Sequence, residues 1–165
     1  MKDVVQCLLP HKRRLSTHIA TRLYRAPEVK ILEKHYFKQM DIWACGVIMA
    51  DLFKYLCGDQ TPFAIICTQD QKKKPSLQIF KGSHCFPLSP KNVKFEADGL
   101  PSTKGDVLDS IFDLIGTPSE TDISFISDQQ AANYIRKFTK RPKSNFKEIF
   151  PCVSDEGLHL LTQML

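Results

Sequence analysis

The sequence predicts a mainly α-helical fold, because helical spacing of apolar residues recurs along the chain and no segment shows a strong strand pattern. The chain has 165 residues, 42% of them hydrophobic, which suffices for one packed domain or one large lobe. Start and stop signals support four of the predicted helices. These segments are residues 39–56, 105–116, 127–138 and 154–165.

The first long helix is expected over residues 39–56, "QMDIWACGVIMADLFKYL". Apolar residues cover most of its circumference, so we expect burial on most sides. Asp41 near its start suits an N-terminal position, where a carboxylate accepts backbone N–H groups and meets the positive end of the helix dipole. Ahead of this helix, Pro27 followed by "EVKILEK" favours a short helical turn.

Between residues 57 and 104 the periodicity fades, and Gly, Pro, Ser and Lys punctuate the chain as they do in loops. Within this stretch, residues 77–90 ("LQIFKGSHCFPLSP") form an apolar island that we expect to pack against the core. Helical spacing resumes directly afterwards, so we do not place a domain boundary here.

The helix at 105–116 has clear ends, because Asp106 can cap its start and Gly116 can stop it. Ser119 stands three residues before Asp122, which is the spacing of a capping box at the start of a further helix.

The last third of the chain continues in helices. Residues 127–138 are amphipathic, and residues 145–151 ("NFKEIFP") are expected to be a short linker with Phe146 and Phe150 as buried anchors. The predicted inner face of 127–138 is Ala131, Ala132, Ile135 and Phe138.

Composition limits the classes of partner. Six cysteines are scattered without the spacing of a disulfide framework, which favours free thiols in a reducing cytoplasmic or nuclear compartment. No two ligand pairs stand at zinc spacing, so we expect no metal site. The longest apolar run is too short to cross a membrane, and the basic runs lack the interleaved aromatic residues of nucleic-acid binding. We therefore expect neither membrane nor nucleic-acid partners.

Six motifs stand in the order found in the C-terminal lobe of protein kinases. They are "TRLYRAPE", "DIWACGVIMADLF", "FKGSHCFPLSP", "LDSIFDLIGTPSETDISFI", "NFKEIFP" and "GLHLLTQML". The wording is similar to the mitogen-activated and cyclin-dependent kinases, and the third motif resembles the mitogen-activated branch. The resemblance covers residues 16–165 as a partial C-terminal lobe with a loop-rich insert over 57–104. Residues 1–15 are a non-matching lead segment.

The resemblance implies that an intact parent would be a serine/threonine kinase in signalling. It would transfer the γ-phosphate of ATP, with Mg²⁺, to Ser or Thr followed by Pro, and its partners would be protein or peptide substrates and docking proteins. No Gly-rich loop, catalytic Lys, His-Arg-Asp or Asp-Phe-Gly motif precedes Thr21, although phosphoryl transfer needs these parts. We therefore expect an incomplete lobe without cofactor or metal and without catalysis of its own. The alternative is a non-catalytic, pseudokinase-like protein-binding module or a truncated gene product.

The first motif resembles a substrate platform. In the family, the residue at Thr21 supports the catalytic Asp by hydrogen bonding. That Asp is missing from this sequence, so the role of Thr21 is latent here. Arg25 would donate a hydrogen bond to the backbone carbonyl of Ala20. That carbonyl is then no longer free to accept from the substrate residue that follows the phosphorylated Ser or Thr. Proline is favoured at this substrate position because it has no N–H to satisfy. Arg22 and Arg25 also resemble a pair that binds phosphotyrosine.

The sequence departs from the family at the regulatory positions. Ser16, Thr17 and His18 stand where the family carries Thr-x-Tyr, so the tyrosine switch is missing. Ser16 and Thr17 remain candidate phosphorylation sites. Leu23 replaces a Trp that is usual before Tyr-Arg-Ala-Pro-Glu.

Four further residues are expected to have structural roles. In the family, the residue at Glu28 forms an ion pair with a later Arg, and the residue at Asp41 holds the backbone of the catalytic loop. Trp43 and Gly46 are expected to be core and close-packing positions.

Overall fold

The computed structural model describes residues 21–31, 37–58, 78–86 and 95–165, and the structural statements below concern these residues. Their helices are α1 (Pro27–Lys30), α2 (Gln39–Cys57), α4 (Val107–Ile115), α5 (Gln129–Arg136), α6 (Phe146–Ile149) and α7 (Asp155–Met164). The strand-like pairings among them are isolated bridges, His84 with Asp106 and Phe95 with Pro101. The prediction of a mainly helical fold is confirmed.

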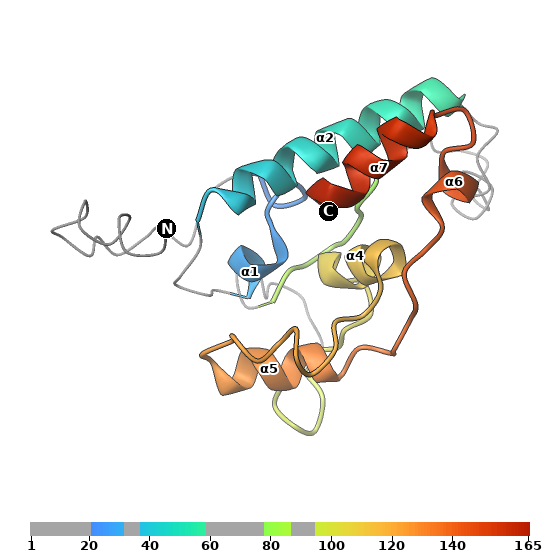
Figure 1. Cartoon of the computed structure of the whole chain (residues 1–165). Helices are drawn as coiled ribbons and strands as arrows, with labels where there is room; N and C mark the ends of the chain where they lie inside the picture. The colour runs from blue at the N-terminus through green and yellow to red at the C-terminus, as the bar shows by residue number, and fades with distance from the viewer. Residues whose placement is uncertain (1–20, 32–36, 59–77, 87–94) are drawn as a thin grey trace, which may run out of the picture.

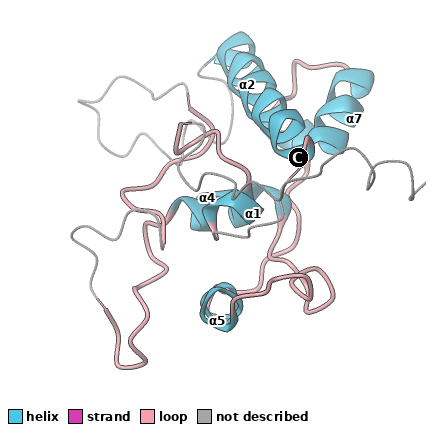
Figure 2. Cartoon of the chain, turned by 90° about the vertical axis from the view of Figure 1, so that its left-hand side faces the viewer, coloured by secondary structure: helices cyan, strands magenta, loops and turns pink. Residues whose placement is uncertain are grey.

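The helices lie in three tiers. Figures 1 and 2 show α2 and α7 side by side at one end of the molecule, α1 and α4 in the middle, and α5 at the other end. Aromatic pairs join the tiers. Trp43 of α2 stacks on Phe80 with ring centroids 5.9 Å apart, and Phe112 of α4 meets Phe138 edge-on at 5.0 Å. The predicted burial of the apolar island is confirmed where it is described, because Phe80 and its neighbour Ile79 are both buried.

Side-chain caps fix the starts of several helices, and the cap at Asp106 was predicted. Asp106 Oδ1 accepts from the backbone N–H of Leu108 at 2.8 Å at the start of α4. The helix ends at Gly116, whose φ of 86° lies in the left-handed region that favours glycine. Asp128 caps α5 by accepting from Gln130 N at 2.7 Å. All four predicted inner residues of α5 and the turn after it are buried.

The predicted capping box forms, but no helix follows it. Ser119 N donates to Asp122 Oδ2 at 2.8 Å, and Asp122 N donates to Ser119 Oγ at 3.3 Å. Residues 120–125 make turns instead of a helix. A box satisfies backbone donors locally, and it does not by itself provide the apolar face that a helix buries.

Helix α2 differs from its prediction in two ways. It begins at Gln39, and the preceding Lys38 provides no side-chain cap. Asp41 lies in the first turn, where its carboxylate is near the positive end of the helix dipole. The expected burial on most sides is wrong, because one face stays exposed among the described residues. Its large apolar side chains are between about half and 70% exposed: Ile42, Ile48, Leu52, Tyr55 and Leu56.

Residues 146–149 form the single-turn helix α6, where a linker was expected. Asn145 explains the helix, since its side-chain oxygen accepts from Lys147 N at 3.0 Å and caps the turn. The two predicted anchors, Phe146 and Phe150, are both buried.

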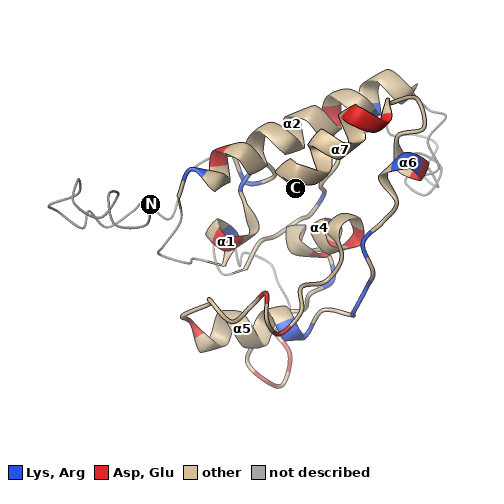
Figure 3. Ribbon diagram, viewed as in Figure 1, with Lys and Arg blue, Asp and Glu red and all other residues tan. Residues whose placement is uncertain are grey.

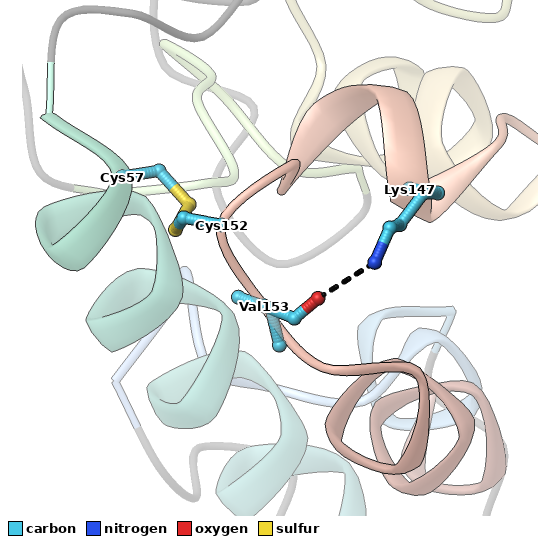
Figure 4. The surroundings of a disulfide bond; sticks show 4 residues. All are labelled: Cys57, Lys147, Cys152 and Val153. Carbon is cyan, nitrogen blue, oxygen red and sulfur yellow. Dashed lines mark hydrogen bonds between the residues drawn. A yellow bond between two sulfur atoms is a disulfide. The ribbon is translucent and has the colours of Figure 1, made fainter.

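The expectation of free thiols is wrong for one pair. Cys57 and Cys152 form a disulfide between the end of α2 and the turn before α7, as Figure 4 shows. The two cysteines are 95 residues apart, so only the folding of α7 against α2 brings them together. Cys45 and Cys85 are free thiols, the first exposed and the second buried.

Charged residues are spread over several elements, as Figure 3 shows. Three residues of the basic run that begins at the last residue of α5 are in ion pairs: Arg136 with Glu120, Lys137 with Glu96 and Asp98, and Arg141 with Asp109 and Asp113. Within the part of the chain that is described, no helix combines the length and the apolar character needed to cross a bilayer.

Candidate functional site

The candidate platform is the segment 21–30, which turns and then enters α1. The backbone N–H of Tyr24 donates to the carbonyl of Thr21 at 2.9 Å. Ala26 is extended, and Pro27 opens α1, where its missing N–H costs nothing. Arg25 and Ala26 are buried, whereas Thr21 is exposed. The segment therefore has an open end at Thr21 and an anchored end at α1.

Arg22 fastens the platform to the segment 78–86. Its guanidinium donates to the carbonyl of Ser83 at 3.1 Å and to that of Gly82 at 3.3 Å. A side chain at Gly82 would lie 2.6 Å from the backbone N of Val107, so only glycine fits there. In this conformation Arg22 holds a neighbouring loop, and binding a phosphate would require it to leave these carbonyls.

Arg25 is buried, with only 8% of its surface exposed. The structure therefore does not present Arg22 and Arg25 as one exposed fork for an anion. The expected contact of Arg25 with Ala20 involves a residue outside the described ranges, as do the candidate phosphorylation sites Ser16 and Thr17.

Asp51 of α2 ties the platform to the long helix. Its Oδ2 accepts from the hydroxyl of Tyr24 at 2.9 Å, and its Oδ1 accepts from the backbone N–H of Ile79 at 2.6 Å. The hydrogen bond to Asp51 raises the pKa of Tyr24. Asp51 was not predicted as a site residue. The signal for it is the single carboxylate that interrupts the apolar run of α2.

Lys30 is a fully buried cation under the platform. Its side chain is 0% exposed, and Nζ donates to the carbonyl of Arg25. Burial lowers the pKa of Lys30 from 10.5 to about 8. The sequence does not predict the burial of Lys30, because a lysine after Pro-Glu-Val in a polar stretch is normally at the surface.

Asp106 is a buried hub between α4, α5 and the segment 78–86. Besides capping α4, its Oδ2 accepts from Phe86 N and from the hydroxyl of Tyr134, each at 2.9 Å. Burial, followed by the neighbouring Asp106 carboxylate, raises the pKa of Tyr134 above its usual range. His84 Nε2 lies 3.8 Å from Asp106 Oδ2. The hub fixes the loop that Arg22 holds.

Cys85, beside His84, is a poor ligand and a poor nucleophile. Burial raises the pKa of its thiol to about 11, so it stays protonated near neutral pH. Among the described residues there is no group of three or more His, Cys, Asp and Glu side chains that could hold a metal ion.

A cavity of about 440 Å³ lies beside the platform. Its lining is mostly apolar and comes from α1, α2, α4, α5 and the turns at 117–126. Trp43 lines it, and the indole Nε1 is the one buried side-chain N or O atom without a hydrogen-bond partner among the described residues. Glu28 and Leu165 line the same cavity. The mostly apolar lining suits an apolar group.

The remaining predicted residues lie along α2. Gly46 is buried against α7, where an added Cβ would be 2.8 Å from Met164 Cβ and 2.9 Å from Leu165 Cδ2. Trp43 is 7% exposed. Asp41 is exposed in the first turn and lies away from the platform hydrogen bonds described above.

Comparison with known proteins agrees with this arrangement. Extracellular signal-regulated kinase 1 of Dictyostelium discoideum is 30% identical over 155 residues, which is 94% of this chain and 22% of that protein. Mitogen-activated protein kinase p38b of Drosophila melanogaster is 29% identical over 94% of this chain and 32% of its own length. The chain is related to the mitogen-activated protein kinases. It corresponds to a segment of their C-terminal lobe.

A third relative gives the same result. Mitogen-activated protein kinase pmk-1 of Caenorhabditis elegans is 28% identical over 92% of this chain and 29% of its own length. The chain thus spans between about a fifth and a third of the length of these relatives. No protein-family model matches it.

Proposed function

We propose that this chain provides the peptide-positioning part of a mitogen-activated-type kinase. An intact parent would transfer the γ-phosphate of ATP, with Mg²⁺, to Ser or Thr followed by Pro in protein substrates. The observation that carries the proposal is the anchored platform: Arg22 and Tyr24 attach it to the segment 78–86 and to α2, and Pro27 opens α1 behind it. A platform that is anchored at α1 and held along its length by Arg22 and Tyr24 can keep a peptide backbone in one orientation.

The chain alone is proposed to bind peptides without transferring phosphate. Phosphoryl transfer needs a carboxylate for the substrate hydroxyl, carboxylates for Mg²⁺ and a loop over the nucleotide. None of the corresponding motifs stands ahead of Thr21 in this sequence. The second candidate is a non-catalytic binding module, and the anchored platform favours it equally. In the first candidate other chain segments supply the catalytic parts, and in the second no segment supplies them.

Regulation and surroundings are part of the proposal. Phosphorylation of Ser16 or Thr17 would place negative charge beside Arg22 and Arg25 in sequence. The partners would be protein or peptide substrates and docking proteins. A cytoplasmic or nuclear location fits these partners.

Peptide binding by the purified chain tests this function. A fluorescent peptide with Ser-Pro and its Ser-Ala counterpart are titrated with wild type and with Arg22→Ala, and Arg136→Ala serves as a surface-arginine control. We expect the Ser-Pro peptide to bind at least several-fold more tightly, the Arg22 variant to lose this preference and the control to keep it. Equal affinity for both peptides would contradict the platform. Transfer of radiolabelled phosphate from ATP by the chain alone would contradict its proposed lack of catalysis.

A further inference from the structure

The disulfide joins the end of α2 to the turn before α7. Cys57 is the last residue of α2 and is 9% exposed, whereas Cys152 is exposed in the turn between α6 and α7. Their Cα atoms are 5.6 Å apart, within the usual range for a disulfide. Figure 4 shows the bond at the end of α2, just ahead of the segment that leads into α7.

Helix α7 depends on α2 for its attachment. Of its ten residues only Leu158 and Leu161 are buried. It meets α2 closely at both ends, where Gly46 faces Met164 and Leu165, and where Phe53 lies 3.4 Å from the position of a Cβ on Gly157. A short helix with so little buried surface gains most of its stability from such tertiary contacts. The disulfide lies at the end of this contact where α7 begins.

We propose that Cys57 and Cys152 form a redox-controlled latch that holds α7 on α2 when oxidised and releases it when reduced. In the reducing compartment proposed above, a disulfide is usually transient and redox-sensing. The exposed side of the bond is Cys152, which gives a reductant access. Release of α7 would also withdraw Leu165 from the wall of the cavity that Trp43 lines. Reduction of the Cys57–Cys152 bond would therefore open the cavity beside the platform on the side of Leu165.

The chemistry is thiol–disulfide exchange with a cellular dithiol. A thiolate of the dithiol attacks the sulfur of Cys152, the S–S bond breaks, and Cys57 leaves as a thiolate that takes a proton from water. The second thiol of the dithiol then attacks the mixed disulfide and frees Cys152 as a thiol. Two electrons and two protons pass from the dithiol to the protein, and the dithiol becomes a disulfide.

The other described cysteines cannot replace either partner. Cys45 lies twelve residues before Cys57 on the same helix, which places it roughly 18 Å away along the axis. Cys85 is buried, free and protonated near neutral pH. Among the cysteines that the structure describes, the latch is therefore specific to Cys57 and Cys152.

Two measurements on the full chain test the latch. Peptide mapping without reductant, after alkylation of free thiols, should link the Cys57 peptide to the Cys152 peptide. Hydrogen exchange then compares α7 with α4 before and after treatment with dithiothreitol. We expect the α7 amides to exchange roughly tenfold faster or more after reduction, while α4 amides keep their protection. Oxidised dithiothreitol should restore the slow exchange.

Variants separate the latch from a general effect of the reductant. Cys45→Ser should respond to dithiothreitol like wild type. Cys57→Ser and Cys152→Ser should show fast α7 exchange without reductant and no further change with it; Cys152 lies in an exposed turn, so its substitution leaves the core intact. Unchanged α7 protection on reduction, a link from Cys57 to a different cysteine, or equal loss of protection in α4 would each overturn the proposal.

Discussion

Replacing Lys30 by methionine should stabilise the protein at neutral pH, although it removes a hydrogen bond. Burial lowers the pKa of Lys30 from 10.5 to about 8. This difference corresponds to about 3 kcal/mol of unfavourable free energy for the charged side chain in the folded state. Methionine removes this cost and fills similar space, but the carbonyl of Arg25 loses its donor, which costs about 1 kcal/mol. The net gain at pH 7 is therefore about 2 kcal/mol.

The pH dependence gives the sharper test. Below pH 8 the lysine is charged in both the folded and the unfolded chain, so the cost is constant. Between pH 8 and 10.5 the unfolded chain binds the proton more than the folded chain does, so the stability of wild type rises with pH. The advantage of the variant should shrink over this range and become a deficit of about 1 kcal/mol above pH 10.5. Cys85, with its pKa raised to about 11 by burial, lowers stability above pH 9 in both proteins; Lys30 lowers this pKa, so the two losses are similar in size and not identical.

Denaturant unfolding of the oxidised proteins at several pH values measures this difference. Lys104→Met is the matched control, because Lys104 is an exposed lysine in the turn before α4. The control should differ from wild type by less than about 0.5 kcal/mol at every pH. A Lys30→Met variant that is less stable than wild type at pH 7, or whose advantage does not change between pH 7 and 10, would refute the reasoning.

Three other substitutions have definite expectations. Asp106→Asn should lower the free energy of unfolding by about 3 kcal/mol, because an amide accepts less strongly than a carboxylate from Tyr134 and the two backbone donors. A loss below about 0.5 kcal/mol in denaturant unfolding would contradict the role of Asp106 as a hub. Gly46→Ala should cost about 1–3 kcal/mol, since its Cβ would lie 2.8 Å from that of Met164; an unchanged melting temperature would show that α7 does not pack there. The exposed apolar face of α2 should make the wild type self-associate as its concentration rises, and Leu52→Glu should reduce this in light scattering by charging the face. Equal scattering from the two proteins would contradict this expectation.

Local signals predicted the helix ends well. Asp106 and Gly116 act through contacts two to four residues away, and the sequence displays such contacts directly. The same locality explains the error at Ser119, where a capping box forms and the helix does not. A cap is local, but the burial that sustains a helix depends on distant elements.

Distant contacts are what the sequence did not display. Arg22 resembles half of a phosphotyrosine-binding pair, and the sequence did not display its hydrogen bonds to carbonyls about sixty residues away, at Gly82 and Ser83. The burial of Lys30 and the bond between Cys57 and Cys152 likewise depend on how α1, α2 and α7 pack. The platform motif itself was visible, because its residues are consecutive in the chain.

Nuclear magnetic resonance titration of the isotopically labelled chain with a Ser-Pro peptide tests the proposed peptide platform most directly. The account predicts amide shift changes that concentrate in residues 21–30 and 78–86, with clearly smaller changes for the Ser-Ala peptide. Shift changes confined to the exposed face of α2, or equal changes with both peptides, would contradict it.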